Sequence, residues 1–325
     1  MKSLMTLLAL LIPASLSLFA QTEPAQQSAP AQLLPNQQTT LTWPVPEEWP
    51  AGEVRFQILK DDRTLARGVA IRKSVDEKEV LSIDVTIRSR TIPSIVEAKV
   101  QFSCNDKTFE SPVYLFPKSP FSDRTKFLKS ANIELFDSDG GAATVFDQHK
   151  IPFRLLKQVE DADFENSNLL IIAASDSFGD EGFAKSLFNS ALNGQTILCL
   201  CPENSQLKFG RLRSRIVLEG SALPFFKSGR VLESFLEPDL RWQPTQKENS
   251  ILLTAGENKT GWPWIEIHPR LTETKQPKPG KIIFSGLKVI EKHDQVPAAR
   301  HVLWKLIESQ LNSTNNERGN HESSR

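Results

Sequence analysis

The residue of this sequence whose type and position could most readily do chemistry is Cys201, which ends a short apolar run at residues 196–201. Pro202 follows directly, so the run is bounded and too short for a helix. Such a run predicts a buried strand of a parallel sheet. Whether Cys201 reacts or only packs is therefore the first question about function that the sequence poses.

The cysteines of the chain are Cys104, Cys199 and Cys201. Cys199 and Cys201 lie two residues apart on one predicted strand, where their side chains share a face and are poorly placed to bridge. Cys104 falls in a different predicted domain. We expect unpaired, mostly buried thiols, with Cys201 serving as a small apolar residue of the core.

A second group of residues that could bind a ligand follows a predicted strand at residues 133–137. Asp137, Asp139 and a Gly140-Gly141 pair lead from this strand into a predicted helix. The carboxyl edge of an open α/β sheet is where ligands usually bind, and carboxylate acceptors suit hydroxyl-rich ligands such as sugars better than phosphates. The alternative is a purely structural turn in which Asp139 caps the helix.

A third group combines polar and aromatic side chains: Asp239, Arg241 and Trp242, with Trp262 and Trp264. Aromatic rings stack on sugar faces, and a carboxylate with a guanidinium can bind hydroxyl groups. This group predicts a carbohydrate-binding surface. The alternative is an internal ion pair between Asp239 and Arg241 that packs on Trp242.

The charge balance and the histidines limit the partners that we expect. Lys and Arg together number 39, as do Asp and Glu, so the formal net charge is zero. That balance argues against a nucleic-acid partner, whose phosphates require a basic face. The five histidines show no metal-ligand spacing, so we expect no metal and no cofactor.

Two domains must position these residues. Within residues 39–117, short runs of alternating apolar and polar residues, without any helical stretch, predict an antiparallel β-sandwich of immunoglobulin-like architecture. It lacks the Cys–Trp–Cys pattern of true immunoglobulin domains. The predicted strands are residues 54–59, 68–72, 81–88, 96–102 and 108–116.

Within residues 121–312, strands alternate with helices, which predicts a doubly wound α/β domain with a parallel, flavodoxin-like sheet. The predicted strands are residues 133–137, 153–156, 168–174, 196–201, 216–218, 251–254, 264–268 and 281–285. Helices are expected from the Gly140-Gly141 turn to about residue 149, at 180–193 and at 298–311. Residues 235–242 are expected to form a loop or short helix.

The two ends of the chain have compositions of their own. Residues 1–20 combine Lys2, an apolar centre and Ala20, as a signal peptide does, which predicts an exported protein (periplasmic or extracellular) without a membrane segment after cleavage. A retained N-terminal anchor is the alternative. Residues 21–38 and 313–325 are polar and are expected to form a disordered linker and a disordered tail.

Three motifs carry a resemblance to a known family. They are IELFDSDGG at 133–141, FLEPDLRW at 235–242, and GKIIFSGL at 280–287 followed by VPAARHVLWKLIES at 296–309. Through them, residues 121–312 resemble the class I glutamine amidotransferase-like domain. The version they resemble is attached to secreted glycosidases, as in the β-galactosidase trimerisation domain.

The resemblance implies that Cys201 would be the nucleophile and His268 the base of an active member. The chain departs from that pattern because Cys199 and Glu203 stand where the nucleophile elbow needs small residues. Pro202 has no N–H to donate to an oxyanion, and Arg270 replaces the Glu that would orient the imidazole. These departures predict a degenerate, non-catalytic domain.

The leading functional hypothesis is therefore an exported, non-catalytic accessory protein that binds carbohydrate or a glycan-processing protein. One alternative is a Cys–His hydrolase or amidase that uses Cys201 and His268. Another is a purely structural module in which the sandwich mediates oligomerisation.

Overall fold

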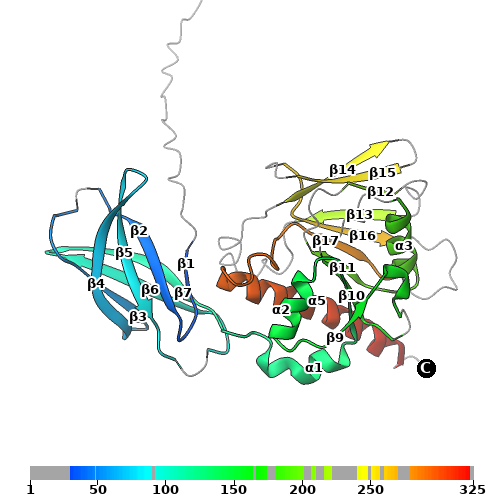
Figure 1. The fold of residues 1–325 in the computed structure, drawn as a ribbon, viewed down its shortest axis with the longest axis horizontal. Coiled ribbons are helices and arrows are strands. Elements are labelled where there is room, and N and C mark those ends of the chain that lie inside the picture. Colours follow the sequence, from blue (N-terminus) through cyan, green and yellow to red (C-terminus); the bar gives the residue numbers. More distant parts are fainter. Residues whose placement is uncertain are drawn as a thin grey trace, which may run out of the picture.

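The computed structural model describes residues 30–47, 49–89, 92–163, 166–173, 181–200, 206–209, 216–221, 240–247, 250–256, 260–269 and 279–322. The described residues form two seven-stranded sheets and one three-stranded sheet (Figure 1). The predicted signal peptide lies outside them.

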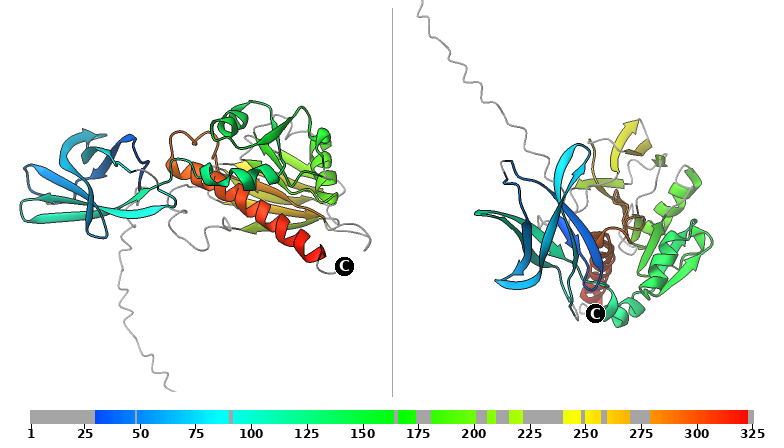
Figure 2. Two further views of the ribbon diagram at one scale, coloured as in Figure 1. Left: turned by 90° about the horizontal axis from the view of Figure 1, so that it is seen from below. Right: turned by 60° about the vertical axis from the view of Figure 1, so that its left-hand side comes forward.

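The first sheet has the order β1-β7-β6-β3-β4-β5-β2 and is antiparallel except for the pair β1–β7. β4 pairs with β3 along its first half and with β5 along its second half, so the sheet turns back over a single core (Figure 2). The strands are β1 (Ala31–Leu33), β2 (Gln38–Pro44), β3 (Val54–Lys60), β4 (Arg63–Val75), β5 (Lys78–Thr86), β6 (Val96–Cys104) and β7 (Lys107–Leu115).

All five strands that alternation predicted in this part of the chain are present, as β3 to β7. β1 differs from expectation because it lies inside the range predicted to be a disordered linker. Leu33 and Leu34 are buried, and β1 pairs with β7. Its three residues gain their order from this pairing, which the polar composition around them does not reveal.

The second sheet has the order β13-β16-β17-β11-β10-β8-β9. Its pairs are parallel from β9 to β17, and β16 and β13 are added antiparallel at one edge. The strands are β8 (Ile133–Asp137), β9 (Phe153–Leu156), β10 (Leu169–Ala173), β11 (Ile197–Leu200), β13 (Ile216–Ser221), β16 (Trp264–Pro269) and β17 (Ile282–Ser285). Each lies at a position that the apolar runs predicted.

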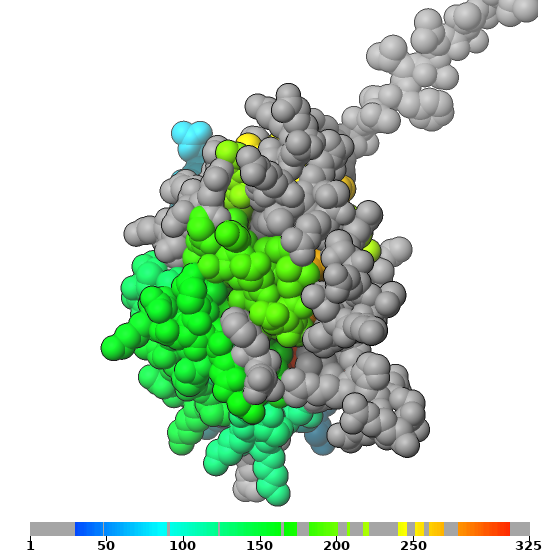
Figure 3. Space-filling model, turned by 90° about the vertical axis from the view of Figure 1, so that its right-hand side faces the viewer, coloured from blue at the N-terminus to red at the C-terminus, as the bar shows by residue number. Residues whose placement is uncertain are grey.

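Helices cover both faces of the second sheet because its strands are apolar on both sides. One face packs on α1 (Thr125–Ser130), α2 (Gly141–Gln148) and α5 (Pro297–Glu322). The other packs on α3 (Glu181–Leu192) and on the three-stranded sheet of β12 (Gln206–Phe209), β15 (Ser250–Gly256) and β14 (Arg241–Lys247). α3 lies on the end of the molecule far from the first sheet (Figure 3). Short 3-10 turns, η1 (Ser122–Arg124) and η2 (Val159–Asp161), complete the described elements.

The first sheet contacts the second part of the chain through α5. Leu34, Tyr114 and Phe116 belong to the same apolar cluster as α5. The Ala298 N–H, in the first turn of α5, donates to the side-chain oxygen of Gln32 at 2.9 Å. This bond satisfies one of the helix amides that has no partner within the helix.

Two further elements differ from the sequence-based expectations. α5 continues to Glu322, through residues that composition assigned to a tail, because a helix that is already packed propagates at little cost. Arg241 and Trp242 open strand β14, although a loop or short helix was expected there. No helix of the described residues combines the length and apolar character needed to cross a membrane.

Candidate functional site

The order of the second sheet reverses at β8, which has β9 on one side and β10 on the other. Ligands of open α/β sheets bind outside the carboxyl ends of the strands at such a point. Asp137 is the last residue of β8, and Asp139 lies in the turn before α2. Both predicted carboxylates are therefore at this edge.

Asp137 stabilises the start of α2. Its Oδ2 accepts the N–H of Ala143 at 2.8 Å, whereas Asp139 Oδ1 accepts the hydroxyl of Ser138 at 3.0 Å. Gly140, with φ of 75°, occupies the N-cap position and offers no side-chain cap. The capping role expected of Asp139 therefore belongs to Asp137. Its Oδ1 is buried and has no hydrogen-bond partner in the structure described, which leaves one open acceptor.

The register of the second sheet bears on the Cys201–His268 pair. Cys201 lies outside the described residues, but it is bonded to Leu200, which is level with Trp264 across β17. His268 is further along β16 by a distance of about 13 Å, at the amino end of β11. Leu200 and His268 therefore lie at opposite ends of β11, because β16 runs antiparallel to it.

His268 instead belongs to a network around Glu266. Its Nε2 lies 3.3 Å from Glu266 Oε2, which also accepts Lys281 Nζ at 3.2 Å, and Trp264 Nε1 donates to Oε1 at 3.0 Å. Burial raises the pKa of Glu266, but the bonds from His268, Lys281 and Trp264 outweigh it and lower this pKa to about 2. The carboxylate is thus ionised and fully paired. Arg270, the other departure from the amidotransferase pattern, lies outside the described residues.

Two thiols have the properties of core residues. Cys104 and Cys199 are unpaired and buried. Burial raises the pKa of the Cys199 thiol well above its ordinary value, so it carries no reactive thiolate. Pro202 and Glu203, like Cys201, lie outside the described residues.

The structure does not bring all residues of the predicted polar–aromatic group to one surface. Trp242 is fully buried, and its ring centroid lies 5.0 Å from that of Phe284. Its ring is therefore not available to a sugar. Asp239 lies outside the described residues, so the predicted ion pair with Arg241 has no counterpart in the part that is described.

The exposed ring of this group belongs to Trp262, whose side chain is 42% exposed. Trp262 pairs with Trp242 in an antiparallel bridge, and their backbones exchange bonds of 2.8 and 3.0 Å. A Cβ added to Gly220 of β13 would lie 1.9, 1.9 and 2.6 Å from three carbons of the indole. Those distances place the added carbon over the face of the ring. One face of Trp262 therefore packs on the backbone of β13.

Two hydrogen-bonding side chains bind the segment that precedes Trp262. Arg241 Nη1 donates to the carbonyl oxygen of Gly261 at 3.4 Å. Gln243 Nε2 donates to the hydroxyl of Thr260 at 2.6 Å. Arg241 has no ion-pair partner among the described residues. An exposed ring can stack on a sugar, and a guanidinium and an amide on the neighbouring strand β14 can donate to its hydroxyl groups.

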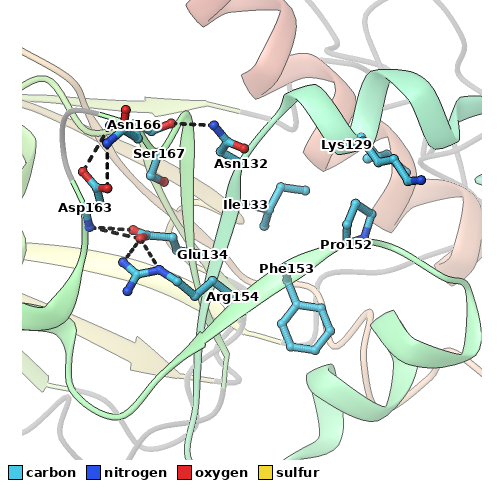
Figure 4. Close-up of a pocket in the computed structure, with 11 residues that line it drawn as sticks. Lys129, Asn132, Ile133, Glu134, Pro152, Phe153, Arg154, Asp163, Asn166 and Ser167 are labelled. Carbon is cyan, nitrogen blue, oxygen red and sulfur yellow. Dashed lines mark hydrogen bonds and ion pairs between the residues drawn. The ribbon is translucent and has the colours of Figure 1, made fainter.

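A pocket of about 360 Å³ lies at the opposite, amino edge of the sheet, where β8 and β9 begin (Figure 4). Its polar side chains bind one another. Buried Glu134 accepts Arg154 Nε at 3.0 Å and the N–H of Asp163 at 3.0 and 3.2 Å. Asn166 Nδ2 donates to Asp163 Oδ2 at 2.8 Å, and Asn132 Nδ2 to the Asn166 carbonyl at 3.0 Å. We interpret the network as a structural brace.

This brace gives a stability prediction. The substitution Glu134→Leu should lower the free energy of unfolding by about 2 kcal/mol, because the N–H of Asp163 is left without its acceptor. Arg154 is 53% exposed and can turn to solvent, so it adds little. Urea denaturation measures the change. Lys129→Ala, in the same pocket, should stay within about 0.5 kcal/mol of the parent, and equal losses in both variants would contradict the assignment.

Sequence reasoning did not find the brace or the histidines His149 and His293, whose rings meet across a gap of 144 positions. Nothing local marks them. Glu134, an acidic residue within an apolar strand, was the signal that a buried partner exists. Among the residues described, no group of three or more His, Cys, Asp or Glu side chains is placed to hold a metal ion.

Comparison with known proteins identifies no family. No family model and no curated protein matches the chain. Solved structures with a partial likeness include an amylomaltase from Corynebacterium glutamicum (14% identity, TM-score 0.22, 46% of this chain and 22% of that one). The titin domains Z1Z2 in complex with telethonin are another (7%, 0.16, 79% and 91%), as is an endo-fucoidan hydrolase of glycoside hydrolase family 107 (6%, 0.15, 79% and 28%). TM-scores this low carry no argument about fold or function.

Proposed function

We propose that this chain is a non-catalytic binding protein whose ligand is a carbohydrate, held on a surface centred on Trp262. The observation that carries the proposal is the indole of Trp262, which packs one face on Gly220 and stays 42% exposed. Arg241 is bound to Gly261, the residue before Trp262. An aromatic ring with an exposed face can stack on the apolar face of a sugar ring.

The residues of this surface have distinct tasks in the proposal. The open face of Trp262 takes the C–H face of a pyranose ring. Arg241 donates to hydroxyl groups of the sugar, because its bond to the Gly261 carbonyl, at 3.4 Å, uses only one of its N–H donors. Gly220 fixes the plane of the indole, since any side chain there would displace it.

The absence of catalysis is part of the proposal. Cys199 is an inert core thiol, and His268 serves Glu266 at the far end of the sheet from Leu200. Pro202 cannot donate an N–H, which would cost an oxyanion site on the order of 3 kcal/mol of transition-state stabilisation. We therefore propose an accessory role, and not that of a Cys–His hydrolase.

The proposal also assigns a fold type to each of the two parts of the chain. We propose an immunoglobulin-like sandwich for the first sheet and a degenerate, amidotransferase-like, doubly wound α/β domain for the second. The parallel order β9-β8-β10-β11-β17 supports the second assignment. Export by the N-terminal 20 residues, to the periplasm or outside, completes the proposal and places the protein where polysaccharides are met.

Binding to a panel of soluble polysaccharides, measured by affinity electrophoresis, tests the proposal. Trp262→Ala should weaken the binding of the recognised polysaccharide about tenfold or more, because the stacking face is lost. Gly220→Ala should weaken it too, since the new Cβ displaces the ring without changing its chemistry.

The matched control is Leu155→Ala, which removes another exposed apolar side chain, 55% exposed, from the distant edge strand β9. It should bind as the parent does. Equal affinity of the Trp262→Ala variant and the parent, or no binding of any polysaccharide by the parent, would overturn the proposal.

A further inference from the structure

Four polar side chains from three separate segments form one continuous hydrogen-bonded chain. Ser119 Oγ lies 3.4 Å from His149 Nδ1, His149 Nε2 lies 2.8 Å from His293 Nε2, and His293 Nδ1 lies 3.1 Å from Asp294 Oδ1. Ser119 belongs to the connection between β7 and η1. His149 follows α2, and His293 with Asp294 belongs to the turn before α5.

The positions of the protons in these hydrogen bonds follow from the chemistry of the four side chains. The Asp294 carboxylate accepts, so His293 carries its proton on Nδ1 and presents a bare Nε2. His149 must then donate from its own Nε2, and its bare Nδ1 accepts from the Ser119 hydroxyl. With both imidazoles neutral, every donor meets an acceptor.

Three parts of the fold meet around these four side chains. The His293 side chain is 1% exposed. The ring of Phe121 packs on His149 with centroids 5.1 Å apart, and on Trp304 of α5 at 5.6 Å. Arg300 Nε donates to the backbone carbonyl of His293 at 2.8 Å, which ties the turn to α5. The connection leaving the first sheet is thus held against α2 and α5 at one place.

Burial and the neighbouring Arg300 oppose protonation of the two histidines, whereas Asp294 favours it. Burial, His293 and Arg300 lower the pKa of His149 to about 4, against the influence of Asp294. Burial and Arg300 likewise lower the pKa of His293, although its bond to Asp294 raises it. The nearby cation Arg124 is directed elsewhere, over the ring of Trp304 at 5.6 Å.

We propose that Ser119, His149, His293 and Asp294 form an acid-sensitive latch, which fastens the connection between the two large sheets to α2 and α5 and opens when the imidazoles are protonated. A first proton can enter on His149 Nδ1, because Ser119 can turn from donor to acceptor. A second proton must go to His293 Nε2. The new N–H of His293 then faces the Nε2–H of His149, with no acceptor between the two N–H groups and with two positively charged rings in contact.

Hydrogen exchange of the full chain, followed by mass spectrometry between about pH 7 and about pH 3.5 and corrected for intrinsic rates, tests the latch. In the parent, peptides covering residues 117–124 and 290–296 should lose protection about tenfold or more in acid, relative to the α3 peptide. His149→Gln should suppress this loss, because its amide N–H can donate to His293 Nε2 but does not titrate.

His268→Gln is the matched control, since His268 is bound to Glu266 away from the latch, and it should behave as the parent. Acid loss of the same size in the parent and in His149→Gln would overturn the proposal, as would full protection of the parent in acid. If His149→Gln does not fold, ¹⁵N spectra of the parent decide. They should show neutral His149 protonated on Nε2 and neutral His293 on Nδ1, and any other tautomer pair overturns the assignment. This proposal is independent of carbohydrate binding.

Discussion

The substitution Gly286→Ala is expected to disrupt the second sheet. A Cβ at this position would lie 1.9 Å from the carbonyl oxygen of Leu240 and 3.2 Å from that of Pro263. Both obstacles are backbone, so no side-chain rotation can relieve the contact. The same backbones are bonded to each other, because Leu240 N–H donates to Gly286 O at 2.9 Å and Gly286 N–H to Pro263 O at 2.8 Å.

Relief of this clash must therefore break bonds at the end of β17, in the middle of the sheet. We expect a loss of about 4 kcal/mol or more in the free energy of unfolding, which approaches the whole stability of an ordinary domain. Urea denaturation followed by circular dichroism measures it. Gly141→Ala is the control, because its nearest atom would be an ordinary 3.7 Å away and alanine is preferred in a helix. Comparable losses in both variants would refute the argument.

A second large effect is expected from acid. Burial and Lys305 lower the pKa of His301 to about 4, against Glu308, and the pKa of His149 is also about 4. In the unfolded chain both have a pKa near 6.5, so the unfolded state binds more protons between about pH 6.5 and about pH 4. Stability is therefore full above about pH 6.5 and falls as the pH is lowered. The upper limit is about 3 kcal/mol for each histidine.

Denaturant unfolding at a series of pH values measures this slope, and His301→Leu isolates one contribution. His301 Nδ1 is buried and has no hydrogen-bond partner among the described groups, and its ring packs on Phe116. An apolar side chain should fit this position and raise the stability in acid. The pH slope of the variant should correspond to about one proton less than that of the parent. An unchanged slope would show that His301 titrates normally.

The sequence predicted the strands of this fold well because their signal is local. The apolar runs at β8, β10, β11 and β17 are buried on both faces, and the alternating runs of β5 and β6 are buried on one. Periodicity reports such burial directly. Strands β1, β2, β12 and β14 were missed because each has only one or two large apolar residues, and their order comes from the strands beside them.

For the candidate site, the sequence predicted which residues take part but not which of their rings are exposed. Trp242 and Trp262 are the same residue type in similar surroundings of sequence, yet one is fully buried and the other 42% exposed. What distinguishes them is the partner: Phe284 for the first ring and Gly220 for the second. Both contacts join residues that are about 40 positions apart in the sequence, and no spacing within the sequence encodes them. The pairing of His149 with His293 is hidden for the same reason.

The position of β17 has a consequence for how the molecule assembles. β17 lies between β11 and β16, although it is the last strand in the chain. Until residues 282–285 have been synthesised, β11 has an open edge of unpaired backbone groups, a template for association with other chains. Closing the sheet then requires a contact over about 80 residues of sequence, which is a slow step. During synthesis, the central strand β11 therefore stays unpaired on one side for a long interval. In that interval a chaperone or a low concentration of chains would be needed to prevent association.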